Sequence, residues 1–150
     1  MRHPVRAAAS DASVTAIVVF EARGDSRLAS LLRPGFAHCF CLLRRSAGWL
    51  VCDPLRDRLR LEIVDAYPVA ELVSRLSSRS RTLLVGTERE SGSSLPFVGG
   101  PTTCVEIVKR VVGRPAPWVV TPWQLYKFLL SAPAARPNFA APEGEHLTSS

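Results

Sequence analysis

Two short apolar runs most constrain the fold of this chain. Val14–Phe20 (VTAIVVF) and Phe36–Leu43 (FAHCFCLL) are seven and eight residues long, rich in β-branched or bulky apolar side chains, and bounded by turn-forming residues. Runs of this length are too short for a membrane span and are typical of strands that are buried on both faces. We therefore expect a buried sheet at the centre of the molecule.

The remaining elements follow from alternation and from capping signals. Three further strands are predicted over residues 49–53, 59–64 and 82–85, with a hairpin turn at Ser46-Ala47-Gly48. Helices are predicted over residues 26–32, 68–76, 104–112 and 122–130. The fold class is α+β, with a mainly antiparallel sheet of about five strands packed against a helix. Residues 13–130 are predicted to form a single domain, preceded by a flexible arm (1–12) and followed by a disordered Ala/Pro-rich tail (131–150).

Charge and composition exclude several classes of function. The formal net charge is +6, from 19 basic and 13 acidic residues, but the arginines are scattered and no aromatic residues interleave them. This pattern is typical of a solvated basic surface and argues against a nucleic-acid partner. The chain has no run of about 18 apolar residues and no secretory signal pattern at its start, so we expect no membrane span and synthesis in the cytoplasm.

Cys104 is the residue that most clearly points to chemistry. Thr103 and Glu106 have the spacing of a capping box, which places Cys104 in the first turn of a helix. The unpaired N–H groups and the positive end of the helix dipole at that position favour thiolate over thiol, and the thiolate is the nucleophile. The alternative is that Cys104 is a small buried residue that packs the helix on the sheet.

His38 and Asp53 are the candidate partners of this thiol. The other two histidines lie in the predicted arm and tail, so His38 is the histidine predicted on a regular element. Asp53 ends the next strand, and an antiparallel hairpin would bring it near the start of the His38 strand, where a carboxylate would orient the imidazole. The alternatives are a core histidine satisfied by backbone or water, and a turn aspartate before Pro54.

A zinc site is the competing use of these residue types. His38, Cys39, Cys41 and Cys52 would be its ligands, but strand alternation points His38 away from Cys39 and Cys41, and a second paired-cysteine motif is missing. We therefore expect the four cysteines to be free thiols, with no metal and no cofactor.

The order of a strand-borne histidine, a polar residue on the next strand and a cysteine that opens a helix resembles the circularly permuted branch of the papain-like superfamily. The matching segments are residues 36–54 (FAHCFCLLRRSAGWLVCDP) and 101–113 (PTTCVEIVKRVVG). That branch includes permuted relatives of NlpC-type peptidases and lecithin:retinol acyltransferase-like proteins. The resemblance implies a permuted papain-like fold with Cys104 as nucleophile, His38 as general base and acid, and Asp53 as the orienting residue. The acyltransferase-like members tend to carry Asn-Cys-Glu-His at the nucleophile, where this chain has Thr-Cys-Val-Glu, so the substrate class does not transfer.

The sequence thus predicts a thiol-dependent hydrolase or acyltransferase that acts on an amide or ester bond, with a cell-wall peptide amide of the peptidoglycan type as one candidate substrate. The compact form also resembles small proteins of tailed phages, which implies a virion-associated location as one candidate. The alternative is a catalytically silent structural or accessory protein with the same fold. Aromatic residues near the C-terminal helix would then offer a surface to a protein partner, although core packing is their other use: Trp118, Trp123, Tyr126 and Phe128.

Overall fold

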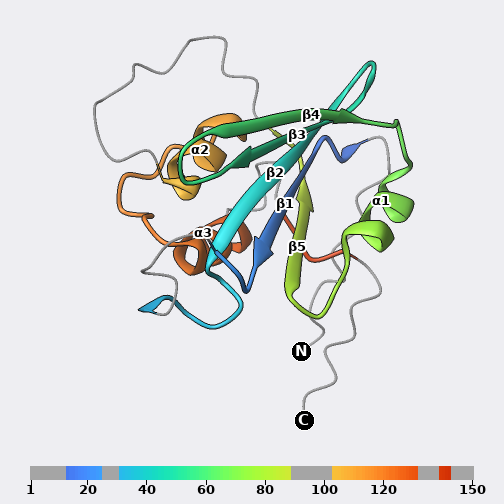
Figure 1. Cartoon of the computed structure of the whole chain (residues 1–150). Coiled ribbons are helices and arrows are strands. Elements are labelled where there is room, and N and C mark those ends of the chain that lie inside the picture. The colour runs from blue at the N-terminus through green and yellow to red at the C-terminus, as the bar shows by residue number, and fades with distance from the viewer. Residues whose placement is uncertain (1–12, 25–30, 89–102, 132–138, 143–150) are drawn as a thin grey trace, which may run out of the picture.

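The computed structural model describes residues 13–24, 31–88, 103–131 and 139–142 (Figure 1). Its elements are β1 (Ala16–Glu21), β2 (His38–Arg45), β3 (Gly48–Pro54), β4 (Leu59–Val64), α1 (Val69–Leu76), β5 (Arg81–Gly86), α2 (Cys104–Val111) and α3 (Pro122–Leu130). The architecture is α+β, and the five predicted strands are confirmed. Of the predicted helices, those at 68–76, 104–112 and 122–130 are confirmed, whereas the one at 26–32 lies almost wholly outside the described residues.

The five strands form one antiparallel sheet in the order β4-β3-β2-β1-β5. β2 pairs with β1 along most of its length, from Glu21↔His38 to Ala16↔Leu43. Its ladder with β3 is shorter and begins only at Cys41↔Cys52. The first three residues of β2 are therefore paired on one side only, and this opening between β2 and β3 positions the candidate site.

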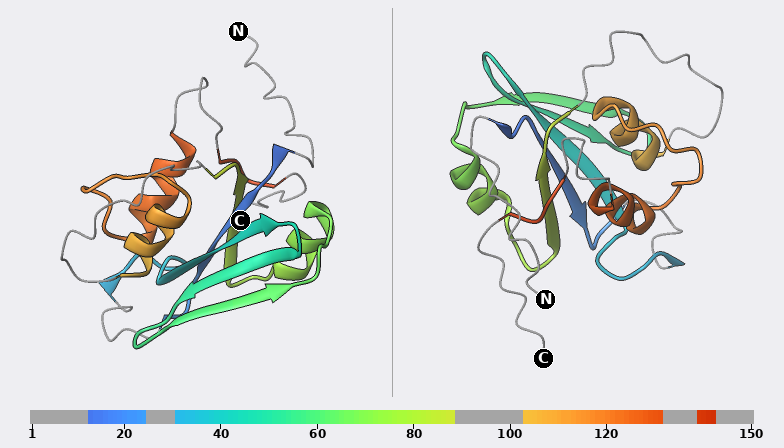
Figure 2. Two further views of the ribbon diagram at one scale, coloured as in Figure 1. Left: turned by 90° about the horizontal axis from the view of Figure 1, so that it is seen from above. Right: turned by 180° about the vertical axis from the view of Figure 1, so that it is seen from behind.

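Helices cover both faces of the sheet (Figure 2). α2 and α3 lie on one face and α1 lies on the other. The first five residues of β1 show why an apolar run is needed between these layers, because successive side chains enter the two cores in turn. Val18 and Phe20 join the cluster under α2 and α3, whereas Ile17 and Val19 join the cluster under α1, and all four are fully buried.

The hairpin between β2 and β3 depends on a glycine. Gly48 has a φ of +138°, and a Cβ at this position would lie 2.1 Å from the carbonyl oxygen of Val64 on β4. A side chain here would meet both an unfavourable backbone conformation and a steric clash with a backbone atom. Gly48 thus fixes the register that places the end of β3 beside the start of β2.

The ends of α2 and α3 follow the predicted capping chemistry. The Thr103 hydroxyl accepts a hydrogen bond from the Glu106 N–H at 3.2 Å, but the Glu106 carboxylate pairs with Lys109. Only half of the expected capping box is therefore formed at α2. At α3 the box is complete, between Thr121 and Gln124.

A buried lysine holds the connection between these two helices. Lys109 is 2% exposed, and its ammonium donates to the carbonyl oxygens of Ala116 at 2.7 Å and Val119 at 2.8 Å. A buried charge needs such partners, because an unpaired ammonium in the core would be strongly destabilising. The segment after α2 is thereby tied to the same helix that carries Cys104.

The predicted disordered tail is wrong at its described residues. Phe139 is 1% exposed and belongs to the core under α2 and α3, and Ala140 pairs with Val85 of β5 through two backbone hydrogen bonds. The physical reason is that one aromatic side chain can dock a segment whose composition is otherwise rich in Ala and Pro. The predicted arm (1–12), residues 89–102 and the rest of the tail lie outside the described residues.

Candidate functional site

The sulfur of Cys104 lies at the first residue of α2, where the capping signal predicts it. The helix packs on β2 and β3, with Val105 and Val108 buried in the core. Cys104 itself is partly exposed, unlike the three other cysteines, which are buried. The thiol is therefore held by a rigid helix and remains within reach of solvent.

His38 and Asp53 meet across the opening between β2 and β3. The Nε2 atom of His38 lies 2.8 Å from Oδ1 of Asp53, and the two side chains are 14% and 15% exposed. The predicted hairpin thus brings this imidazole and this carboxylate together. His38 and Cys104 also interact and shift each other's pKa, so all three predicted site residues belong to one cluster.

The contacts of His38 change its proton affinity. Burial by itself would lower its pKa, but the hydrogen bonds to Cys104 and Asp53 and the negative charge of both groups raise the pKa from 6.5 to about 9. At neutral pH the imidazole is therefore protonated. Both ring nitrogens then carry protons, which suits a group with an acceptor on each side.

Cys104 shifts in the opposite direction. The hydrogen bond from the Cys39 thiol lowers its pKa most; burial opposes this, and hydrogen bonds from His38 and from the Cys39 backbone N–H lower it further, from 9.0 to about 4. The resting site at neutral pH is thus a thiolate beside an imidazolium. Such a pair holds the sulfur in its nucleophilic form before any substrate arrives.

Cys39 is a member of the cluster that the sequence did not predict. Its thiol and its backbone N–H both hydrogen-bond the Cys104 sulfur. Alternation along the strand points Cys39 away from the His38 side chain, which hides this role in the sequence. The one available signal is that Cys39 faces the helix layer, where the nucleophile is expected.

The arrangement is suited to attack on a carbonyl carbon. A thiolate at a helix N-terminus can add to an amide or ester, and the imidazolium can protonate the leaving group. Amide N–H groups of the first turn of α2 are oriented to stabilise negative charge near the sulfur, because this is the positive end of the helix dipole. These are the chemical requirements of acyl transfer through a thioester.

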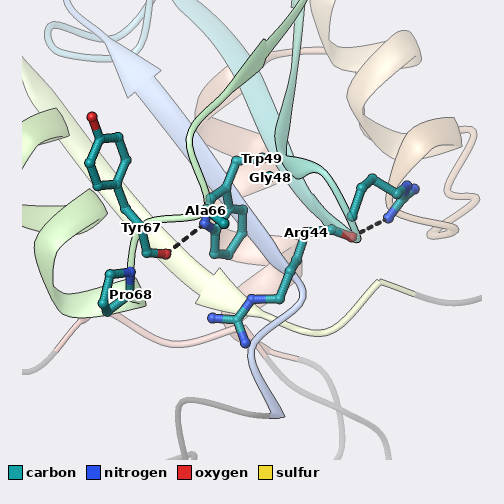
Figure 3. Close-up of a pocket in the computed structure, with 7 residues that line it drawn as sticks. Arg44, Gly48, Trp49, Ala66, Tyr67 and Pro68 are labelled. Atoms are coloured by element: carbon teal, nitrogen blue, oxygen red, sulfur yellow. Dashed lines mark hydrogen bonds between the residues drawn. The ribbon is translucent and has the colours of Figure 1, made fainter.

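A hollow on the surface of the described residues lies away from this cluster. It has a volume of about 320 Å³ and is lined by Arg44, Arg45, Gly48, Trp49, Ala66, Tyr67 and Pro68 (Figure 3). Trp49 closes its wall by donating its indole N–H to the Tyr67 carbonyl oxygen at 2.9 Å. Because Arg44 and Arg45 end β2 whereas His38 begins it, the hollow and the thiolate lie at opposite ends of one strand.

Over the described ranges, no group of three or more His, Cys, Asp or Glu side chains is placed to hold a metal ion. His38 and Asp53 are bonded to each other, and Cys41 pairs with Cys52. In the same part of the chain, none of the helices has the length and apolar character that crossing a bilayer requires.

Comparisons of this chain with protein-family models, with curated proteins and with solved structures find no match.

Proposed function

We propose that this chain is a thiol-dependent hydrolase or acyltransferase that acts on an amide or ester bond through Cys104, His38 and Asp53. One observation carries the proposal: the imidazole that lies 2.8 Å from the carboxylate of Asp53 also interacts with Cys104, and each of the two groups shifts the pKa of the other. A histidine that merely satisfies itself in a core needs one partner from the backbone or from water. Here its two partners are an orienting acid and a nucleophile.

The proposed reaction starts from the ion pair. The Cys104 thiolate attacks the carbonyl carbon, and the N-terminal N–H groups of α2 stabilise the oxyanion. The His38 imidazolium gives its proton to the leaving amine or alcohol, which departs and leaves a thioester on the sulfur. Neutral His38 then takes a proton from water or another acceptor, and the attack of this acceptor releases the acyl group and restores the thiolate. Asp53 holds the ring in position throughout.

We further propose a circularly permuted papain-like architecture. It is supported by the chain order: a histidine at the start of β2, an acid near the end of β3, and a cysteine that opens a helix packed on these strands. The residues around the nucleophile, Thr103-Cys104-Val105-Glu106, differ from the pattern of the acyltransferase-like members. A peptide amide of the peptidoglycan type is therefore one candidate substrate to be assayed, beside simple esters.

The direct test is formation of the thioester. Incubation with p-nitrophenyl acetate should release one burst of nitrophenolate per chain and add one acetyl group to the peptide that contains Cys104, as read by mass spectrometry. Cys104→Ala should abolish both signals. Cys41→Ala is the matched control, because Cys41 is a buried cysteine on β2 whose partner is Cys52, and it should keep the burst.

The outcomes of this acetylation experiment distinguish an enzyme from a catalytically silent structural or accessory protein. Acetylation of another residue, or equal bursts from the wild type and Cys104→Ala, would show that Cys104 is not the nucleophile. If Cys104 is not acylated by this ester or by muropeptides, and Cys104→Ala retains the full stability of the wild type, the chain is the catalytically silent structural or accessory protein instead.

A further inference from the structure

The four cysteines of this chain are arranged as two thiol pairs on one face of the sheet. Cys39, Cys41 and Cys52 belong to the core under α2 and α3, and Cys104 packs against the same cluster. Cys39 hydrogen-bonds Cys104, and Cys41 hydrogen-bonds Cys52, its directly opposite residue in the β2–β3 ladder. All four are free thiols. In the proposed acyl-transfer reaction the Cys39 thiol lowers the pKa of Cys104 but forms and breaks no covalent bond.

The two members of the first pair differ in access to solvent. Cys39 is fully buried, at 0% exposure, whereas Cys104 is partly exposed. A small oxidant from solvent therefore reaches Cys104 first and finds Cys39 directly behind it. An accessible thiolate beside a second thiol is the arrangement typical of cysteines that oxidise reversibly.

We propose that Cys104 is a site of reversible oxidation by hydroperoxides and that Cys39 is its resolving cysteine, so that the two form a disulfide. The Cys104 thiolate attacks one oxygen of hydrogen peroxide and breaks the O–O bond, which gives a sulfenic acid and hydroxide. The His38 imidazolium protonates the hydroxide to water. The Cys39 sulfur then attacks the sulfenic sulfur, and the thiol proton leaves with the displaced hydroxyl as a second water.

The electrons and protons of these oxidation steps balance within the cluster. The two sulfurs lose two electrons in total, the peroxide gains them, and the two protons of the products come from His38 and Cys39. The sulfurs must approach to about 2.05 Å. Cys104 packs against the core cluster that contains Cys39, and it lies at a helix end, where one turn can adjust more readily than a strand.

The electrostatics of the pair support this order of events. The pKa of Cys104 is lowered to about 4, whereas burial and the neighbouring Cys104 sulfur raise the pKa of Cys39 well above its ordinary value. One sulfur is thus an anion and the other keeps its proton. This matches the roles of peroxide-reducing thiolate and proton-carrying resolving thiol.

The effect of the disulfide on acyl transfer rests on the proposed function, whereas the formation of the disulfide does not. If Cys104 is the nucleophile, the disulfide blocks acyl transfer until a thiol reductant restores it. It would also protect the sulfur from irreversible oxidation to the sulfinic acid.

The test uses the full-length wild-type protein and a small excess of hydrogen peroxide. Free thiols should fall from four to two per chain, and non-reducing peptide mapping should find the Cys39 peptide linked to the Cys104 peptide. Alkylation of Cys104 should fall by about ten-fold or more and return after treatment with dithiothreitol. Cys39→Ser should instead carry Cys104 to the sulfinic acid, and Cys41→Ala should behave like the wild type.

Other products would overturn the proposal. Accumulation of Cys104 sulfinic acid in the wild type would show that Cys39 does not resolve the sulfenic acid. A disulfide between Cys41 and Cys52, or a mixed disulfide between two chains, would assign the oxidation to another pair. Because the wild-type peptide map decides these cases, a poorly folded variant does not affect the test. A disulfide in a protein whose Cys104 is acylated neither by the ester nor by muropeptides would disprove the proposed acyl transfer and leave the redox site intact.

Discussion

The reaction of Cys104 with iodoacetamide should depend on pH in a way that no ordinary thiol shows. Cys39 and His38 lower the pKa of Cys104 from 9.0 to about 4, against the effect of burial. Thiolate is the reactive form, so the alkylation rate should rise with a midpoint near pH 4. It should then stay nearly level until His38 loses its proton near pH 9.

The ratio between the alkylation rates of Cys104 and a simple thiol follows from two opposing factors. At pH 5, a thiol with a pKa of 9.0 is about one part in ten thousand thiolate, whereas Cys104 is about nine-tenths thiolate. A lower pKa also makes a thiolate less nucleophilic, by a factor of about 100 to 300 over this shift. Cys104 should therefore react about 30 to 90 times faster than a simple thiol at pH 5 and about 50 to 150 times slower at pH 9.

The assay is competitive labelling with N-acetylcysteine in the same tube, read by mass spectrometry of the Cys104 peptide across the pH range in which circular dichroism reports the native fold. Partial burial of Cys104 scales all its rates together and does not move the midpoint. A rate that climbs towards a midpoint near 9.0, the pKa of an unperturbed thiol, would refute the ion pair and the reasoning built on it.

Four further substitutions, two of them paired with a control variant, test separate features of the structure. His38→Asn removes the contacts to both partners, so the alkylation midpoint should move to higher pH and ester turnover should fall by about 10²- to 10⁴-fold, as stopped-flow and labelling kinetics would show. Gly48→Ala, at a φ of +138° with a backbone oxygen 2.1 Å from the new Cβ, should lower the free energy of unfolding in urea by about 2–3 kcal/mol. Gly35→Ala is its control, with positive φ but open space, and should cost about 1 kcal/mol. Phe139→Ala should cost about 3–5 kcal/mol in the same assay if the aromatic ring anchors its segment. Thr103→Ala should cost about 1 kcal/mol through loss of the cap, and Thr103→Ser should recover most of it.

Each of these expectations has a clear contrary result. An unchanged labelling midpoint in His38→Asn would show that the imidazole does not control the thiol. Equal losses in the two glycine variants would mean that the steric contact with β4 is unimportant. A loss of unfolding free energy below about 1 kcal/mol for Phe139→Ala would show that this side chain does not pack in the core. An equally small loss of unfolding free energy in both Thr103 variants would show that the hydroxyl does not stabilise the start of the helix.

Much of the fold is predictable because the decisive signals are local. The run that contains Ile17 and Val19 is apolar at every position from 16 to 20, and this suffices to predict a strand between two layers. Thr103 and Thr121 mark helix starts by their own side chains. The contact between His38 and Asp53 also follows from local rules, because a tight hairpin brings the far ends of its two strands together.

The parts that could not be predicted depend on tertiary packing. Cys39 reaches the nucleophile because the β2–β3 ladder begins only at Cys41, and no local signal gives the point at which two strands stop pairing. Lys109 would be expected on a solvated helix face, yet the chain after α2 folds back and supplies carbonyl oxygens to it. Phe139 is one aromatic residue in a segment whose composition otherwise predicts disorder.

The hydrogen bond from the Cys39 amide to the Cys104 sulfur links a backbone resonance to the charge of the nucleophile. When the sulfur gains a proton or an acyl group, this amide loses its anionic acceptor, while the neighbouring amides of β2 keep theirs on β1. In an NMR spectrum, one cross-peak in the middle of a sheet should therefore titrate with the thiol and shift again when the thiol is covalently occupied. The chain thus contains its own spectroscopic indicator of whether the sulfur is charged, neutral or modified, and it needs neither a substrate nor an attached label.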